Sequence, residues 1–550
     1  MIGVQLVGLV FLPALIGGLV LLVGAPLTPL AWLPVIGLLS IMAREQSGRS
    51  FKETAWRAAL AAQLVVAGVA FTALFVASAI LDTSWDGQAY HLRAVLALSE
   101  GWNPVWDLPL RHYLVDFLPK SAWVVESLVL MGTGSLEGAK GIHITMIVGA
   151  FALWYAAAAN LGLGRRWAMV VSLLIAANPI AINQSLTFYV DGLVASTLSV
   201  MAAVVLLWWH TGDRLWLFLG IVGFAFLANL KFNGLALAGL AAACLLLWVA
   251  IKAPQRSRGL MGAVVASMVC AGIQGINPYL TNTLRHGHPL HPLMGGVAEP
   301  GIELIYSRNA AFLAQSPPRR LIHSIAARAT NDSEEWPRFK APFSVDLEEL
   351  TAFTDADTRI GGWGPLFSGC LVLSALLMAF SIRQEGARVH ALLQAVLWLF
   401  VLPAEQSFWA RYSAHLWLTP AFTLLLAARG GTAAPRFLRA GLAIAMTLNV
   451  VLACTPSIGA RVIRDLAERR QLEVMAQASR EGPLQVHFGL FGGVRQRLAD
   501  AGVVYREQES LECDQPARLP SSTVEYCLGD GRSPAPAQRP IEVLTGLLNR

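Results

Sequence analysis

The chain has 550 residues, of which 55% are hydrophobic and only 14% are charged, and its mean hydropathy is +0.55. Soluble domains carry about 25% charged residues, so this composition excludes an ordinary water-soluble globular protein. The formal charge of +6 is spread over connecting loops, which does not suit a nucleic-acid surface. We therefore predict a lipid bilayer, and no nucleic acid, as the partner of most of the chain.

Apolar runs long enough to cross a hydrocarbon core of about 30 Å recur along the sequence. We predict an all-α polytopic membrane protein with about thirteen transmembrane helices. The first run lacks the basic leader of a cleavable signal peptide and is interpreted as a retained span. Two short runs, 215–228 and 389–403, can be tilted, broken or re-entrant. The predicted spans are residues 2–24, 27–43, 58–81, 142–162, 168–186, 190–209, 215–228, 234–252, 260–277, 365–381, 389–403, 413–430 and 438–456.

Basic residues fill every second loop between these spans, and such loops are typically cytoplasmic. The other side then receives two large segments, 82–141 and 278–364, together with the tail. The chain divides into two N-terminal helices with a basic loop (1–57), a transmembrane domain (58–456) and a small C-terminal α/β domain (457–550). The basic residues are Arg44, Arg49, Lys52, Arg57, Arg165, Arg166, Arg214, Lys252, Arg256, Arg258, Arg383, Arg388, Arg429, Arg436 and Arg439.

The tail has the pattern of a small mixed domain. PLQVHFGL has strand character, VRQRLADAG indicates a short helix closed by Gly502, and VVYREQ indicates a second strand. On the non-cytoplasmic side, Cys513 and Cys527 are predicted to form a disulfide. On the entropic model this bond is worth about 3 kcal/mol. Two unpaired thiols are the alternative.

The first large segment begins with D-T-S-W-D-G-Q-A-Y-H, directly after the third span. Asp82 is the simpler candidate for a helix cap, a role that Ser84 can also fill. Asp86 stands beside a glycine at the start of a helix that carries Tyr90 and His91. A carboxylate at the membrane surface can act as a general base, so Asp86 is the preferred catalytic residue, with His91 and Asp82 as further candidates.

Cations on the same side are candidates for binding an anion such as a lipid phosphate. Lys120, Lys231 and Arg411 are the strongest of these, because charges near hydrocarbon are costly and usually functional. Snorkelling to the headgroups is the alternative for each of them.

The segment NPYLTNTLRHGHPLHPL brings three histidines within six residues, at 286, 288 and 291. Two prolines interrupt it, no carboxylate is local, and no pair has helical i, i+4 spacing. We therefore do not predict a zinc site there.

Four stretches together resemble the GT-C superfamily of integral membrane glycosyltransferases, in particular its bacterial branch of ArnT-like and protein mannosyltransferase-like enzymes. DTSWDGQAYHL looks like the first-loop segment that carries the catalytic acid in that superfamily. FYVDG, after the turn at Asn178 and Pro179, is similar to a recurrent aromatic–Asp break between spans. NTLRHGHPLHPL resembles a G-N-P-x-x-P loop, with His288 in place of the usual asparagine. GGWGPLF and ARY resemble late segments of the branch.

The resemblance implies transfer of a sugar from a polyprenyl-phosphate donor to a hydroxyl of a glycan, lipid or protein. Asp86 would be the general base, and Lys120, Lys231 and Arg411 would bind the donor phosphate. Tyr90, Asp191, Arg285 and His288 are the expected substrate contacts.

No metal is expected to be required. A divalent cation such as Mg²⁺ or Mn²⁺, held by Asp86 with Asp355 and Asp357, is the alternative. The acidic pair is more simply interpreted as part of a solvated loop.

Two other functions compete with the glycosyltransferase. A transporter or flippase of a lipid-linked or polar solute usually places ionisable groups near the bilayer midplane and shows internal repeats, and the sequence has neither feature. A non-catalytic assembly protein is the second alternative. The arginine-rich, lysine-poor composition indicates a bacterial inner membrane, with the site facing the periplasm.

Overall fold

The structure is a computed structural model, and it describes residues 1–46, 53–295, 309–332, 334–381, 386–429, 435–530 and 533–534. The first half is helical throughout and contains α1 (Ile2–Leu22), η1 (Pro29–Ala31), α2 (Trp32–Gln46), α3 (Glu53–Ser78), η2 (Gly87–His91), α4 (Leu92–Ser99), α5 (Tyr113–Phe117), α6 (Ser121–Thr133), η3 (Glu137–Lys140), α7 (Gly141–Asn160), α8 (Arg165–Ala176), α9 (Pro179–Gln184), α10 (Asp191–Thr211), α11 (Arg214–Ala228), α12 (Phe232–Lys252) and α13 (Pro254–Gln274).

The second half adds further helices and ends in a small sheet. Its helical elements are η4 (Ile276–Leu280), α14 (Thr281–His286), α15 (Ala310–Leu313), α16 (Pro317–Ala326), α17 (Leu347–Ala352), α18 (Phe367–Ser381), α19 (Ala387–Val401), η6 (Ala410–Trp417), α20 (Leu418–Arg429), α21 (Arg436–Ala478), η7 (Gly492–Val494) and α22 (Arg495–Asp500). The strands are β1 (Leu484–His487), β2 (Tyr505–Glu507), β3 (Ala517–Arg518) and β4 (Glu525–Cys527).

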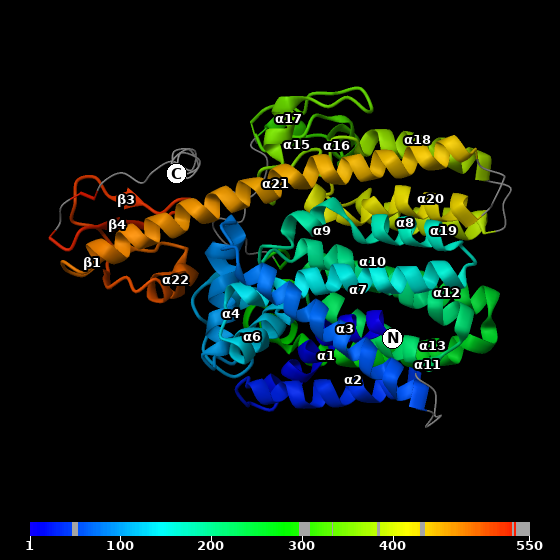
Figure 1. The fold of residues 1–550 in the computed structure, drawn as a ribbon, viewed down its shortest axis with the longest axis horizontal. Coiled ribbons are helices and arrows are strands. Elements are labelled where there is room, and N and C mark those ends of the chain that lie inside the picture. Colours follow the sequence, from blue (N-terminus) through cyan, green and yellow to red (C-terminus); the bar gives the residue numbers. More distant parts are fainter. Residues whose placement is uncertain are drawn as a thin grey trace.

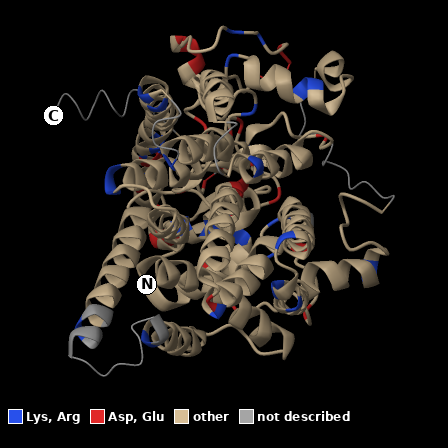
Figure 2. Ribbon diagram, turned by 90° about the vertical axis from the view of Figure 1, so that its right-hand side faces the viewer, with Lys and Arg blue, Asp and Glu red and all other residues tan. Residues whose placement is uncertain are grey.

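Seven helices of the described chain are long and apolar enough to cross a membrane: α1, α3, α7 (with η3), α10, α12, α13 and α21. Large apolar side chains cover the outside of some of them; on α3, Leu64, Phe71 and Phe75 are 65%, 70% and 66% exposed. Such a surface would be a liability in water and suits contact with lipid. Most of the ribbon in Figure 2 is neutral, in keeping with the scarcity of charged residues. The fold is that of a membrane-embedded helical protein.

The other predicted spans form helices of 12 to 15 residues, namely α2, α8, α11, α18, α19 and α20. The number of crossings therefore stays a prediction. The span predicted at 168–186 is broken, because Asn178 accepts a hydrogen bond from the backbone N–H of Ile180 and Pro179 occupies the first turn of α9. Both features start a new helix.

The long helices lie side by side, with α4, α6 and the C-terminal sheet at the left end of the bundle in Figure 1. The described basic residues of the predicted cytoplasmic loops lie at the opposite helix ends, including Arg165 at the start of α8, Arg214 at the start of α11 and Lys252 at the end of α12. Arg49, Lys52 and Arg383 lie outside the described residues.

The last span does not end at residue 456. Instead α21 runs for 43 residues as one helix, from Arg436 to Ala478, and extends beyond the bundle to the C-terminal sheet (Figure 1). The strand order is β2-β1-β4-β3, with β1 and β2 parallel and the other pairs antiparallel. The predicted strand, helix and strand are confirmed as β1, α22 and β2, and Gly502, with φ of +72°, follows α22.

The C-terminal domain packs on the first large segment. Phe491 contacts Trp85 edge to face at 5.9 Å between ring centroids, and the amide of Gln88 donates to the carbonyl of Ser521 at 2.7 Å. A disulfide joins Cys513 to Cys527, with 6.0 Å between the Cα atoms. The bond closes the loop that carries Ser521, so it constrains a contact between the two regions.

Candidate functional site

Five charged side chains from five chain segments meet at one end of the bundle. Asp86 follows α3, Asp191 is the first residue of α10, Lys231 precedes α12, Asp357 precedes α18, and Arg411 lies in η6 between α19 and α20. We call these five residues the carboxylate cluster. Helices α3, α10, α12, α18 and α20 thus hold fixed a group of charges that no single segment could assemble.

Arg411 is the centre of the carboxylate cluster. Its Nη1 atom lies 2.9 Å from Asp86 Oδ2, 3.4 Å from Asp357 Oδ2 and 3.9 Å from Asp191 Oδ2, and its side chain is buried. Burial alone would lower the pKa of Arg411, but the surrounding carboxylates, led by Asp357, raise it well above the usual value. Arg411 is therefore a fixed positive charge that holds three acids together.

Asp86 has a second partner and one free oxygen. The phenol of Tyr90, one turn later in η2, donates to Oδ2 at 3.1 Å, and Arg411 donates to the same oxygen. Burial raises the pKa of Tyr90 well above its usual value, so the phenol stays a donor. Among the described residues, Asp86 Oδ1 has no hydrogen-bond partner and is available to a ligand.

A glycine follows each of the first two acids of the carboxylate cluster. A Cβ atom on Gly87 would lie 2.0 Å from Asp82 Oδ2, and one on Gly192 would lie 2.8 Å from the Cα of Ala181. These close approaches let the chain fold back at Asp86 and let α10 start against α9 at Asp191. The Asp–Gly pairs of D-G-Q-A-Y and Y-V-D-G are therefore packing requirements of the site.

Asp191 is paired with the second cation. Lys231 Nζ donates to Asp191 Oδ1 at 2.5 Å, and the Asp191 side chain is 1% exposed against 22% for Lys231. Asp191 Oδ2 is buried without a hydrogen bond in the described chain. Both predicted phosphate-binding cations of the cluster, Lys231 and Arg411, are thus already neutralised by carboxylates.

Asp357 corrects one sequence-based interpretation. We expected the acidic pair of T-D-A-D-T to be solvated, and Asp355 is exposed, but the Asp357 side chain is only 12% exposed. The indole of Trp409 donates to Asp357 Oδ1 at 2.6 Å. Burial raises the pKa of Asp357 to about 7, with Arg411 opposing the shift and Asp86 adding to it.

Aromatic rings enclose the two cations. The guanidinium carbon of Arg411 lies 4.4 Å from the Trp409 ring, 5.1 Å from Tyr412 and 5.3 Å from Tyr189. Lys231 Nζ lies 4.3 Å from the Tyr412 ring. These distances are within cation–π range. The sequence shows these aromatics beside Asp191 and Arg411 in FYVDG and FWARY, but it does not predict that their rings enclose the cations.

The two other predicted catalytic residues lie outside the carboxylate cluster. His91 accepts a hydrogen bond from the Trp123 indole at 2.6 Å, and burial lowers its pKa well below the usual value. In the described structure His91 forms no hydrogen bond with Asp86, and it is Tyr90 that donates to this carboxylate. Asp82 is fully buried and accepts backbone N–H bonds from Ser84 and Phe188, both at 2.8 Å. Asp82 therefore braces the turn, and it is Ser84 that caps the helix, because its hydroxyl accepts the backbone N–H of Gly87 at 3.3 Å.

Lys120, Arg285 and His288 also lie apart from the carboxylate cluster. Lys120 donates to the backbone carbonyls of Asp116 and Leu118, and burial lowers its pKa to about 7. Arg285 is exposed on α14, while His288 accepts a bond from the Leu290 N–H at 3.1 Å.

The histidines of this region are arranged as a packed stack. The rings of His286 and His291 lie 4.1 Å apart at their centroids, and both contact Phe117 edge to face.

The structure also bears on the alternative of a divalent cation. Arg411 Nη1 already occupies the space between Asp86 and Asp357, and Asp355 points into a separate cavity. Within the described ranges, no group of three or more His, Cys, Asp or Glu side chains is arranged to hold a metal ion.

Comparison of the chain with models of known protein families, with curated proteins and with solved structures gives no match. The fold and the site define a membrane-embedded helical protein with a charged centre at one end of its bundle. Any narrower statement of function has to come from the chemistry of that centre.

Proposed function

We propose that this protein is a membrane glycosyltransferase of the GT-C type, which moves a sugar from a polyprenyl-phosphate donor to an acceptor hydroxyl. The observation that carries the proposal is the convergence of Asp86, Asp191 and Asp357 on Arg411, beside Lys231. General-base catalysis at a lipid surface needs such an acid, and departure of a phosphate needs such cations.

In the proposed reaction, Asp86 takes the proton of the acceptor hydroxyl on its unpaired Oδ1 oxygen. The acceptor oxygen forms a bond to the anomeric carbon of the sugar while the bond from that carbon to the phosphate oxygen breaks. The electron pair leaves with the polyprenyl phosphate, and direct displacement inverts the anomeric centre. Arg411 and Tyr90 orient Asp86 through its other oxygen.

The cations of the carboxylate cluster would then have different roles. Arg411 is buried among three carboxylates and fixes their positions. Lys231 is more exposed, and among the described residues its one ion-pair partner is Asp191. Lys231 is thus the better placed of the two to face a leaving phosphate. Asp357, with a pKa of about 7, can hold a proton near neutral pH and so reduce the negative charge that a phosphate meets.

The distribution of charge favours this proposal over a transporter. In the described parts of the long helices α3, α10, α12 and α13, charged residues stand near helix ends, as Asp191, Lys252 and Arg256 do. A transporter usually needs such groups near the middle of its spans. Lys252 and Arg256 stand with the basic loops at the opposite end, while Asp191 stands at the end that carries the carboxylate cluster, where a surface reaction needs it. We place that end on the periplasmic side of a bacterial inner membrane.

The test is transfer by the purified full-length chain in nanodiscs, supplied with a panel of polyprenyl-phosphate sugars and envelope glycans and analysed by mass spectrometry. Asp86→Asn should reduce transfer at least 100-fold while the chain still inserts and folds. Asp107→Asn is the matched control, since Asp107 is an exposed acid of the same segment. Loss of transfer in Asp82→Asn but not in Asp86→Asn would move the base to Asp82.

A transport assay in proteoliposomes separates the alternative function. Movement of a lipid-linked sugar across the bilayer without formation of a glycoside would contradict the transferase. If neither Asp86→Asn nor Asp82→Asn changes transfer or transport, the carboxylate cluster is not the functional centre.

A further inference from the structure

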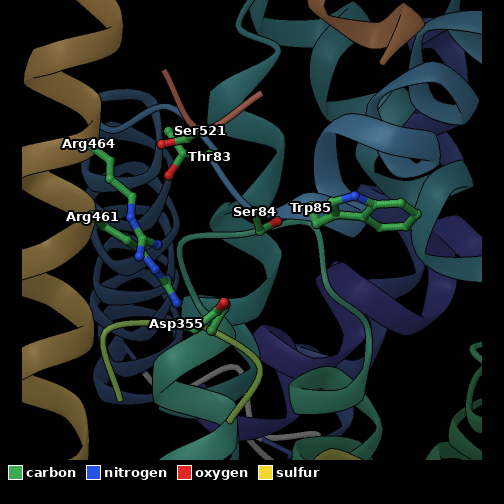
Figure 3. Close-up of a pocket in the computed structure, with 8 residues that line it drawn as sticks. Thr83, Ser84, Trp85, Asp355, Arg461, Arg464 and Ser521 are labelled. Carbon is green, nitrogen blue, oxygen red and sulfur yellow. The ribbon is translucent and has the colours of Figure 1, made fainter. Parts of the chain in front are cut away.

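A cavity of about 270 Å³ adjoins the carboxylate cluster. Four segments that are distant in sequence build it: the turn before η2, the loop before α18, the helix α21 and the C-terminal domain. Trp85 and Ala356, in its lining, directly precede Asp86 and Asp357 in the chain. The lining residues are Thr83, Ser84, Trp85, Asp355, Ala356, Arg461, Arg464 and Ser521 (Figure 3).

Two arginines in this lining form no ion pair with a described residue, although the carboxylates of Asp82 and Asp355 act on Arg461 from a distance. Arg461 is 3% exposed; its Nη2 donates to the Ser457 hydroxyl at 3.3 Å, and its Nη1 is buried with no hydrogen bond in the described structure. Arg464 is partly buried, and neither side chain forms an ion pair with any described residue. The other arginines of this part of α21 are paired, Arg469 with Asp465 and Arg470 with Glu473.

The spacing of Arg461 and Arg464 places them on the same face of α21, where like charges repel. Figure 3 shows both side chains extending from α21 toward the space beside Thr83, Ser84 and Asp355. A buried guanidinium without a counter-charge in contact is costly, and an unsatisfied buried donor calls for an explanation. An anion in the cavity would supply both the missing charge and the missing acceptor.

The rest of the lining suits an oxyanion. One acid, Asp355, is present, but it is exposed and its Oδ1 accepts the backbone N–H of Asp357 at 3.3 Å. The lining itself holds two arginines and one aspartate, with Asp82 buried behind it next to Thr83, and Thr83, Ser84 and Ser521 add hydroxyl groups. The volume fits a phosphate with a small attached group and is too small for a long lipid chain.

The C-terminal domain completes the cavity. Ser521 belongs to the loop that the disulfide between Cys513 and Cys527 closes, and its carbonyl accepts the amide of Gln88 at 2.7 Å. Gln88 lies in η2, two residues after Asp86. One wall of the cavity is thus a constrained loop of a separate domain, anchored to the helix that begins at the candidate base.

We propose that this cavity is a binding site for a phosphate-class oxyanion, with Arg461 and Arg464 as its ligands and the disulfide-closed loop as its outer wall. The planar guanidinium fork matches a phosphate geometrically. A soluble phosphate and the phosphate of a lipid headgroup share this chemistry. The site rests on the cavity and on its unpaired arginines and requires no transfer reaction.

The test uses the full-length chain in nanodiscs of zwitterionic phosphatidylcholine, titrated with inorganic phosphate and, separately, with a short-chain isoprenyl phosphate by calorimetry. Arg464→Gln and Arg461→Gln should each weaken binding at least tenfold. Arg470→Gln, an exposed arginine of the same helix, should leave it unchanged. If Arg461→Gln does not fold, Arg464→Gln decides, with Arg464→Lys expected to restore part of the affinity.

Each outcome has a defined meaning. Arginine-dependent binding of inorganic phosphate indicates a soluble ligand, and arginine-dependent binding of the isoprenyl phosphate alone indicates a lipid headgroup. Absence of both, or equal binding by Arg464→Gln and Arg470→Gln, overturns the site. Because binding is measured without any transfer, a chain that binds phosphate but transfers no sugar would refute the proposed function and leave this site intact.

Discussion

Two buried arginines of this protein both lie among carboxylates, but they differ in how many of their nitrogens have hydrogen-bond partners. Arg497, on α22, donates from Nε and Nη2 to Glu137, from Nη1 to Glu468, and from Nη2 also to the carbonyl of Asp82. All three of its nitrogens are used. Arg411 also lies among carboxylates, yet its Nε has no partner in the described chain, and Asp191 Oδ2 and Asp86 Oδ1 beside it are free of hydrogen bonds.

This difference indicates a structural role for one group and a functional role for the other. We call Arg497 with Glu137 and Glu468 the clamp, and the Arg411 group is the candidate site. The Arg497 group joins the C-terminal domain to η3 and α21. Every nitrogen of its arginine has a partner, and Glu468 Oε2 is its one buried atom without a hydrogen bond in the described chain. The Arg411 group has more acids than cations, and it has aromatic walls. Burial raises the pKa of one carboxyl to about 7 in both groups, that of Asp357 beside Arg411 and that of Glu468 beside Arg497. An unused donor on a buried guanidinium costs stability, so we infer that Arg411 Nε and the free carboxylate oxygens beside it serve a ligand. We expect substitutions at the clamp to affect folding and substitutions at the site to affect chemistry.

Breaking the clamp should have the largest effect. Arg497→Met leaves Glu137 and Glu468 buried without their shared counter-charge, which typically costs about 3–5 kcal/mol. We expect the full-length variant to accumulate poorly and to lose its monodisperse peak in size-exclusion chromatography. Arg495→Met, two residues earlier, removes a more exposed ion pair with Glu507 and should behave like the wild type. Equal behaviour of the two variants would contradict the clamp.

Removing the disulfide should have a smaller, local effect. Cys513→Ser with Cys527→Ser opens a loop with a sequence separation of 14, and the entropic model predicts a loss of about 3 kcal/mol. Hydrogen exchange should increase in β3, β4 and the loop around Ser521, and phosphate affinity should fall with it. Cys244→Ser, which removes a free thiol, is the control. Unchanged exchange around Ser521 would show that the loop is held by packing alone.

The pH dependence of stability tests whether burial raises the pKa of the Asp357 carboxyl in the Arg411 group. Burial raises the pKa of this carboxyl from 3.8 to about 7, against the pull of Arg411 and with the help of Asp86, Asp355 and Asp191. The protonated Asp357 carboxyl therefore contributes fully to the free energy of unfolding below about pH 4. This contribution declines as the pH rises and is gone above about pH 7.

Asp357→Asn keeps the oxygen that accepts the Trp409 indole but cannot ionise. Between pH 4 and 8 in neutral nanodiscs, the wild type should lose thermal stability relative to this variant, by a few degrees in Tm. Asp355→Asn is the control, because Asp355 is exposed. A constant difference between wild type and Asp357→Asn across this pH range would contradict the shifted pKa.

The sequence alone predicts the helical membrane class and the strand–helix–strand order of the tail, because hydrophobic length and turn residues are local signals. It also singles out Asp86, Asp191, Lys231 and Arg411, each a charge beside an apolar run. It does not reveal which of these charges meet.

Asp357 shows why the rest is not predictable. Nothing in T-D-A-D-T distinguishes Asp357 from exposed Asp355; the difference arises only when Trp409 of another segment donates to it. Lys120 is the opposite case. The sequence makes it a candidate phosphate ligand because lysine is scarce, but it donates to two nearby backbone carbonyls. The 43-residue length of α21 and the packing of the C-terminal domain on η2 likewise depend on tertiary contacts.

The smallest expected effect concerns the orientation of Asp86. Tyr90→Phe removes one of the two donors to Asp86 Oδ2 and leaves Arg411 in place, and it preserves the ring that lies 4.2 Å from the His91 ring. We expect kcat for the proposed transfer to fall about tenfold, equivalent to about 1.4 kcal/mol, with little change in KM. Tyr279→Phe is the matched control, since its partly buried hydroxyl donates to the Ala228 carbonyl away from the carboxylate cluster. A larger loss in Tyr279→Phe than in Tyr90→Phe would contradict a positioning role for Tyr90. An effect of Tyr90→Phe that is confined to KM would mean that Tyr90 binds substrate and does not position the base.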